Sequence, residues 1–211
     1  MKTGDVRFVP PLPKSKQGAI DRLGTSLLDK LALEFEEVFW DPDMDTFNLV
    51  QDEWSLCLNI YKHCTGKPCL MMFNYADTAR KFAKYTDEEL VRSAMKALKI
   101  MFPGAPDWPK HYLRTNWSED IYAKQSYTFN PIGSSIKDFD ILGQSIGSRV
   151  HFAGEHTCGQ FIGCTQTAIL SGYLAAEKLI GQYVRAYTFL AFLLTLLSVL
   201  PICGPRHKTS I

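Results

Sequence analysis

A carboxylate beside a glycine, followed by the start of a helix, is the feature of this sequence best suited to chemistry. Val150–Ala153 is a short apolar run that predicts a buried strand, and Gly154 after it permits a sharp turn or a close backbone approach. Glu155 then stands at the carboxyl end of that strand, where ligands gather in open α/β sheets. The arrangement favours a ligand site at this turn.

The helix that follows could hold a phosphate- or ring-bearing cofactor. Cys164 or Thr165 is suited to be its N-cap, and the helix is expected from Gln166 to about Gln182. Free N–H groups and the positive dipole end, at residues 165–167, favour an electron-rich or anionic group nearby. Small residues that permit close packing recur every four positions on one face: Ala168, Gly172 and Ala176. An ordinary strand–loop–helix unit without a ligand explains the same residues.

The composition predicts a packed globular chain. It has 211 residues, of which 46% are hydrophobic and 21% charged, enough for one good-sized domain or one and a half small ones. A net charge of +1 without a long basic run argues against nucleic-acid binding. His63-Cys64 with Cys69 lacks a second ligand pair, and there is no CxxC, so no metal site is expected.

The patterns of the remaining segments, which must position this turn, predict an α/β (mixed α+β) chain with a mixed sheet and helices. Residues 28–40 alternate apolar and polar side chains, as in a half-buried strand, and Lys30 on it is by default a surface lysine. Thr86 and Glu89 form a capping box at a helix start. Another helix is expected at residues 14–27. Further strands or extended pieces are expected at residues 53–61, 69–75, 112–117 and 125–129.

The two ends of the chain carry apolar runs of different kinds. Val6–Val9 is a short β-like run closed by prolines, and the N-terminal residues lack the apolar region of a signal peptide. Ala186–Gly204 is an uncharged run of 19 residues, just long enough to span a bilayer as a helix. A membrane anchor, a buried terminal helix and a tail appended by alternative splicing all fit this run. The chain is therefore expected in the cytoplasm or held at a membrane by its tail.

Four segments in a fixed order resemble the flavin-containing amine oxidases, a family that includes polyamine oxidases, monoamine oxidases and lysine-specific histone demethylases. They are FVPPLPKSKQGAIDRLG, LLDKLALEFEEVFWDP, NWSEDIYAKQSYTF with GSSIKDFDIL, and FAGEHT followed by AILSGYLAAEKL. The resemblance extends to about Tyr183. It implies the end of an FAD-domain strand at 1–10, a substrate-binding domain at 11–145, a C-terminal FAD-binding segment at 146–183, and a hydrophobic tail at 184–211.

The resemblance also implies roles for single residues. Lys30 matches the family lysine that holds a water near flavin N5, which makes it the expected catalytic residue. Glu155 matches the acid that contacts the ribityl-phosphate part of FAD, and Thr165 matches the position whose backbone N–H faces the flavin N1/O2 edge. Gly154 and Cys164 complete the expected cofactor contacts. The aromatic set expected around substrate and flavin is Trp117, Tyr122 and Tyr127, of which Tyr127 would be closest to the flavin.

Three departures from sequences of the family bear on the cofactor. Thr167 stands where the family often has a glycine before the helix alanine. No GxGxxG occurs in the sequence, so the unit that grips the ADP half of FAD is missing and only the C-terminal part of such an enzyme is expected. No cysteine stands at the position used for covalent flavin attachment, which implies non-covalent FAD.

The activity that the resemblance implies is oxidation of an amine C–N bond to an imine, with oxygen reduced to hydrogen peroxide. A polyamine is the expected small-molecule substrate, and methylated lysine is the alternative. A truncated, non-catalytic isoform or fragment is the other interpretation of the chain, because the lost contacts to the ADP half remove most of the grip on FAD.

Overall fold

The computed structural model describes residues 2–50, 53–61 and 66–199. The chain divides into two compact units, each described here by itself. One unit joins the N-terminal residues through Asp21 with the chain from Ser135 onward, and the other is Arg22–Ser134. The second unit lies within the substrate-binding domain expected at 11–145, and the functional domain boundaries stay a prediction.

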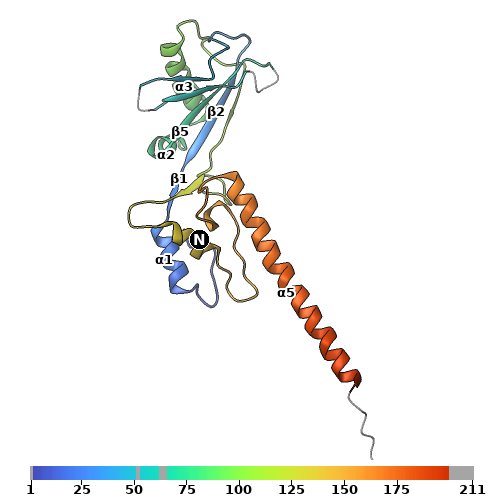
Figure 1. The fold of residues 1–211 in the computed structure, drawn as a ribbon. Coiled ribbons are helices and arrows are strands. Elements are labelled where there is room, and N and C mark those ends of the chain that lie inside the picture. Colours follow the sequence, from blue (N-terminus) through green and yellow to red (C-terminus); the bar gives the residue numbers. More distant parts are fainter. Residues whose placement is uncertain (1, 51–52, 62–65, 200–211) are drawn as a thin grey trace, which may run out of the picture. The chain divides into compact units, whose positions relative to one another are not determined.

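Arg22–Ser134 is built on a five-stranded sheet with the order β3-β4-β5-β2-β6 (Figure 1). Its strands are β2 (Leu28–Glu34), β3 (Thr46–Asn48), β4 (Leu56–Asn59), β5 (Cys69–Tyr75) and β6 (His111–Arg114). A separate two-stranded ladder pairs β1 (Gly24–Ser26) with β7 (Tyr127–Phe129). Every pairing among the described strands is antiparallel, which corrects the expected mixed sheet.

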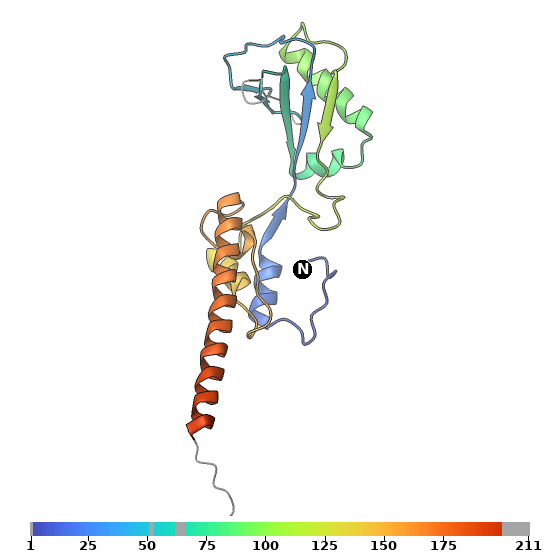
Figure 2. The same ribbon diagram turned by 90° about the vertical axis from the view of Figure 1, so that its right-hand side faces the viewer.

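One face of the five-stranded sheet is buried under α2 (Ala76–Phe82) and α3 (Asp87–Met101) (Figures 1 and 2). The alternation in β2 decides which face, because Leu31 and Leu33 are fully buried whereas Lys30 is exposed. α3 begins as predicted: the Glu89 N–H donates to Thr86 Oγ1 at 3.3 Å, and the Thr86 N–H donates to the Glu89 carboxylate at 2.8 Å. The apolar stripe of α3 completes the core.

The other unit contains, among its described residues, three helices and a short 3-10 turn. They are α1 (Lys14–Arg22), α4 (Ile136–Gly143), the turn Glu155–Thr157 and α5 (Thr165–Val199) (Figure 1). α4 approaches the turn so closely that a Cβ added to Gly143 would lie 2.3 Å from the Thr157 carbonyl oxygen. α5 packs against the same turn, so the segment that carries Glu155 is held by α4 and α5.

Two strands predicted in this unit are wrong. Residues 150–153, all of them described, form no strand, and Val150 makes only an isolated antiparallel bridge with Ile146. Residues 6–9 are irregular as well. An apolar run becomes a strand only where a partner strand can pair its backbone groups. Strands β1–β7 all belong to Arg22–Ser134, so among the described residues of this unit both runs lack a partner strand.

Helix boundaries also differ from the prediction. α1 stops at Arg22, because the residues from Gly24 onward join β1 instead, and the helix expected to end near Gln182 continues to Val199. Residues 136–143, where the sequence predicted no helix, form α4. Across 2–50, 53–61 and 66–199, no helix is long and apolar enough to cross a membrane. Leu200–Gly204, the end of the expected membrane run, and His63-Cys64 lie outside the described residues.

Candidate functional site

Lys30 lies on the open face of β2, opposite the face that α2 and α3 bury. Its Nζ is 5.7 Å from the centre of the Phe73 ring, and Phe73 is its cross-strand partner on β5. A cation–π contact of this kind orients the ammonium while leaving it in water. Thr115 fixes the backbone of Lys30: the Lys30 N–H donates to Thr115 Oγ1 at 2.9 Å, and the Lys30 carbonyl accepts the Thr115 N–H at 2.9 Å.

The three predicted aromatic residues lie on residues 115–127, which we call the aromatic segment. Its two ends form hydrogen bonds with β2, through Thr115 and Ser126. Trp117, near the start, is 40% exposed. Tyr127, at the end, is half-buried in β7 and pairs with Ser26 of β1. Tyr122 is 92% exposed, at a turn between them where Asp120 Oδ1 accepts the Tyr122 N–H at 2.9 Å. The structure thus attaches both ends of the segment to the region of Lys30 and leaves Tyr122 in solvent.

Ser126 attaches the far end of this segment. Its Oγ accepts the Leu28 N–H at 2.8 Å and donates to the Leu28 carbonyl at 3.0 Å, replacing the backbone ladder that a neighbouring strand would supply. The Ser126 N–H also donates to the Ser26 carbonyl at 2.9 Å. Sequence reasoning missed Ser126, because nothing in the sequence distinguishes it from a solvated loop serine.

The turn at Gly154 is held by side chains of α5 and of the turn itself. Gly154 has φ 134° and ψ 168°, a conformation that L side chains rarely adopt. Its N–H donates to Ser171 Oγ at 2.8 Å, and its carbonyl accepts the Thr157 hydroxyl at 2.8 Å. Ser171 and Thr157 are both buried. The backbone that presents Glu155 is therefore fixed on both sides.

The Glu155 carboxylate is only partly exposed and faces defined partners. Its Oε2 accepts the Gly163 N–H at 3.1 Å, which ties the turn to the loop before α5. Its Oε1 lies 3.8 Å from His156 Nδ1. Burial lowers the pKa of His156 below its ordinary value, although the charge of Glu155 opposes the shift. Because the imidazole beside it tends to be neutral, the Glu155 carboxylate keeps its negative charge uncompensated by His156. It is suited to accept hydrogen bonds from the hydroxyl groups of a ribityl chain.

The start of α5 offers backbone N–H donors next to Gly163, whose own N–H binds the Glu155 carboxylate. Among the described residues, the N–H groups of Thr165, Gln166 and Thr167 have no hydrogen-bond partner. Cys164 precedes the helix, and its Sγ points to the Ile162 carbonyl at 3.6 Å rather than capping these groups. A donor set at a helix N-terminus together with a carboxylate fits the electron-rich edge and hydroxyl chain of a flavin.

Thr167 explains one departure from the expected pattern. Its side chain is buried, and its hydroxyl donates to the carbonyls of Gln160 and Phe161 at 2.7 and 2.6 Å. It therefore braces the loop before α5 where the family often has a glycine. The face of α5 that packs within this unit carries Thr167 and Ser171. The small-residue ridge at 168, 172 and 176 meets no close neighbour at Gly172 among the described residues.

Comparison with known proteins agrees with these observations. A family model described as "Flavin containing amine oxidoreductase" matches residues 1–180. The chain belongs to this family. Flavin-containing amine oxidoreductases use FAD, so the turn at Glu155 and the start of α5 are the natural candidates for cofactor contact; the role of each residue stays a prediction.

Relatives of the chain include proteins named as histone demethylases. The chain is 37% identical over 189 residues to lysine-specific histone demethylase 1 homolog 1 of Oryza sativa subsp. japonica, covering 85% of this chain and 22% of that protein. It is 33% identical over 187 residues to homolog 3 of Arabidopsis thaliana, covering 85% and 11%. It therefore spans about a tenth to a quarter of the length of the curated relatives it matches.

Solved structures support the fold. Cyclohexylamine oxidase from Brevibacterium oxydans superposes with a TM-score of 0.71 at 21% identity, over 86% of this chain and 41% of that chain. A putrescine oxidase variant gives a TM-score of 0.71 at 18% identity, over 84% and 40%. Both likenesses show that the amine oxidase architecture accommodates this sequence.

Sequence reasoning also missed Lys16 on α1, a lysine that is only 3% exposed. Its Nζ donates to the carbonyls of Ile141 and Leu142 at 2.7 and 2.6 Å, at the C-terminal end of α4, and lies 4.1 Å from the centre of the Phe152 ring. A cation at a helix C-terminus opposes the negative end of the dipole. Lys16 thus links α1, α4 and the residues just before Gly154.

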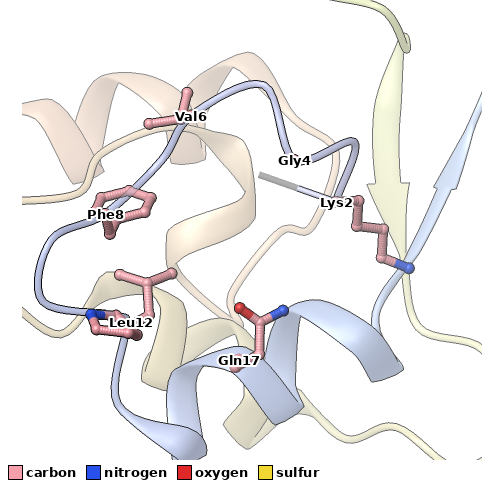
Figure 3. A pocket seen from close by; sticks show the side chains of 7 residues that line it. Lys2, Gly4, Val6, Phe8, Leu12 and Gln17 are labelled. Carbon is pink, nitrogen blue, oxygen red and sulfur yellow. The ribbon is translucent and has the colours of Figure 1, made fainter.

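A cavity of about 290 Å³ lies between the N-terminal segment and Gln17 of α1 (Figure 3). Phe8, Leu12 and Gln17 line it together with residues of the N-terminal segment near Lys2. None of the predicted site residues lines this cavity. It is therefore distinct from the groups that fit a flavin.

The stability of the chain should depend on pH through Lys16. Burial, together with the charge of Lys178, lowers the pKa of Lys16 from its ordinary 10.5 to about 8. Between these two values the unfolded chain keeps the proton that the folded chain has released, so the free energy of unfolding rises with pH. Urea unfolding should show the wild type gaining about 1–3 kcal/mol relative to Lys16→Met from about pH 8 to pH 10.5. The exposed control Lys14→Met should show no such trend.

Gly154→Ala should destabilise the chain by about 1–3 kcal/mol. An added Cβ would lie 2.6 Å from the His156 ring, at a backbone conformation that strains any L side chain. Gly172→Ala is the matched control, because a Cβ there enters open space on a helix and should stabilise by about 0.5–1 kcal/mol. Equal urea midpoints for the two variants would contradict the strained turn.

Proposed function

We propose that this chain supplies the amine-binding and flavin-contacting part of an FAD-dependent amine oxidase. The observation that carries the proposal is the attachment of residues 115–127 to the strand of Lys30, through Thr115 at one end and Ser126 at the other. Aromatic side chains on a segment that is bonded to the strand of an exposed cation suit an amine and a redox ring.

The cofactor contacts proposed for the chain come from the turn and the start of α5. Glu155 would accept hydrogen bonds from the hydroxyl groups of the ribityl chain. The backbone N–H groups at the start of α5, from Thr165 onward, would donate to the N1/O2 edge of the ring. Gly154 would allow the close approach of the backbone, and Cys164 would flank it. When bound, FAD would supply the redox chemistry, which is two-electron oxidation at the carbon beside an unprotonated amine with oxygen as the final acceptor.

The amine side is proposed to be formed by Trp117 and Tyr127, with Tyr122 at the exposed turn. Their rings would exclude water from the bond to be oxidised and would hold an alkylammonium by cation–π contact before it loses its proton. Lys30 would hold a water near the reacting centre and favour, by its charge, the transfer of electrons to oxygen. The substrate must arrive unprotonated, because only then is the nitrogen lone pair available.

Among amines, a methylated lysine side chain is the substrate class we place first. The support is sequence similarity: the relatives at 33–37% identity are named lysine-specific histone demethylases. Polyamines, favoured by the sequence alone, remain the second class, since a putrescine oxidase shares the fold. The two classes differ in charge spacing, and the open face around Lys30 does not by itself select one.

The test is peroxide formation by the full chain supplied with FAD. A dimethyl-lysine peptide should give peroxide faster than the same concentration of spermine, and trimethyl-lysine peptide should give none because it has no lone pair. Faster turnover of spermine would move the proposal to the polyamine class. Peroxide from no amine at all would favour the non-catalytic isoform or fragment instead.

A further inference from the structure

A buried carboxylate lies directly behind Lys30. Asp29, on β2, is 4% exposed and stands on the core face of the sheet, opposite Asn74 of β5, which is buried as well. Carboxylates are seldom buried without partners, because desolvation of the charge costs several kcal/mol. The hydrogen-bond partners of Asp29 therefore show which part of the structure the buried carboxylate holds in place.

In the described structure, both hydrogen-bond partners of Asp29 belong to the aromatic segment, residues 115–127. Asp29 Oδ1 accepts the Thr115 hydroxyl at 2.8 Å and the Trp117 N–H at 3.1 Å. Thr115 Oγ1 in turn accepts the Lys30 N–H at 2.9 Å. One carboxylate oxygen thus connects the backbone of Trp117 directly, and that of Lys30 through a single hydroxyl.

These bonds occupy the edge of β2 that β6 leaves unpaired. β6 ends at Arg114, paired with Leu31, and past this pair a single backbone bond, from the Thr115 N–H to the Lys30 carbonyl, continues the ladder. Beyond that point the segment is held by Asp29, Thr115 and Ser126 rather than by regular strand pairing. Loss of Asp29 would leave two partly buried donors, the Thr115 hydroxyl and the Trp117 N–H, without their acceptor, at a greater cost than loss of a fully exposed hydrogen bond.

From this geometry we infer that Asp29 is a positioning residue, which fixes Trp117 relative to Lys30 and so sets the start of the aromatic segment. The effect of Asp29 on catalysis rests on the proposed function. Its attachment of Trp117 and Lys30 does not depend on that function. Asp29 touches neither substrate nor cofactor in this account; it acts through Thr115 and Trp117.

The test compares amide hydrogen exchange in the full chain across matched variants. Asp29→Ala should speed exchange at Trp117 and Lys30 on the order of 10-fold or more, because both protections depend on the carboxylate. Asp29→Asn keeps an Oδ1 acceptor and should restore both rates to within about 3-fold of the wild type. Thr115→Val, with a similar shape, should speed exchange at Lys30 and leave Trp117 protected.

Asn59→Ala is the control for general destabilisation. Asn59 is buried in the same unit and donates to the carbonyls of Pro42 and Met44, away from the aromatic segment. It should leave exchange at Trp117 and Lys30 within about 3-fold of the wild type. Equal acceleration in Asn59→Ala and Asp29→Ala, or no rescue by Asp29→Asn, would overturn the inference.

The peroxide assay separates this inference from the proposed function. If dimethyl-lysine peptide is oxidised by the wild type, Asp29→Ala should raise KM and lower kcat, with both restored in Asp29→Asn. Unchanged kinetic constants in Asp29→Ala would overturn its positioning role. A wild type without peroxide formation would count against the proposed function, while the exchange rates would still decide whether Asp29 fixes the segment.

Discussion

Lys30→Met is expected to slow peroxide formation from a methylated peptide by about 100-fold, the scale associated with loss of one preorganised electrostatic contact. The variant removes the charge from the open face of β2 and keeps the length of the side chain. Because Lys30 is proposed to favour the step that consumes oxygen, reduction of the cofactor by the peptide without oxygen should slow far less. Stopped-flow measurement of the two half-reactions distinguishes the steps.

Two controls sharpen this result. Lys30→Arg keeps the cation and should retain more activity than Lys30→Met, although its planar group cannot hold a water in the same way. Lys96→Met removes an exposed charge from α3, on the buried-face side of the sheet, and should change neither half-reaction. An equal loss in Lys96→Met and Lys30→Met would mean that only overall charge matters.

Trp54→Ala is expected to lower the free energy of unfolding by about 3–5 kcal/mol. Trp54 is fully buried, stacks on Phe82 with ring centres 4.9 Å apart, and donates its Nε1–H to Ser93 Oγ at 3.0 Å. The substitution leaves a large cavity between the sheet and α2, ends the aromatic contact and leaves Ser93 without its partner. Urea unfolding monitored by circular dichroism measures the change.

Trp108→Ala is the matched control for this substitution. Trp108 is partly exposed and contacts Arg92 at 5.9 Å from the ring centre, so its loss should cost about 1 kcal/mol or less. Similar midpoints for the two tryptophan variants would show that the core described for Arg22–Ser134 is incorrect.

Local patterns predicted much of Arg22–Ser134. The alternation along β2 placed Lys30 on the open face, and the capping box at Thr86 fixed the start of α3. β5 falls at the predicted residues, 69–75. These predictions succeeded because one face of each element is buried, and burial of one face imposes a period that the sequence must carry.

The other unit was harder to predict because its structure depends on distant partners. Val150–Ala153 has the composition of a strand but no strand to pair with among the described residues. α4 was missed although the Ser135 N–H donates to the Asp138 carboxylate at its start, because the helix is short and follows a turn that contains Pro131 and Gly133. Both cases show that composition limits the choices and that long-range pairing decides between them.

The polar residues that organise the candidate site were not predicted. Asp29 bonds to Thr115, 86 residues away, and Lys16 bonds to Ile141, 125 residues away. In sequence each is one charged residue among many, and the usual expectation for both is a solvated side chain. The sequence pattern indicated a ligand site at Gly154 and Glu155, but only the resemblance of whole segments connected this site with a flavin, since the same residues fit an ordinary strand–loop–helix unit.

Flavin binding tests the central claim most directly. In this account the chain contacts the ring and ribityl part of the cofactor through Glu155 and the start of α5, and its sequence contains no GxGxxG for the ADP half. Titration of the full chain with FAD and with riboflavin should therefore show one site for each, with dissociation constants within about 10-fold, and Glu155→Ala should weaken both by about 10-fold or more. No binding of either compound, or binding unaffected by Glu155→Ala, would contradict the account.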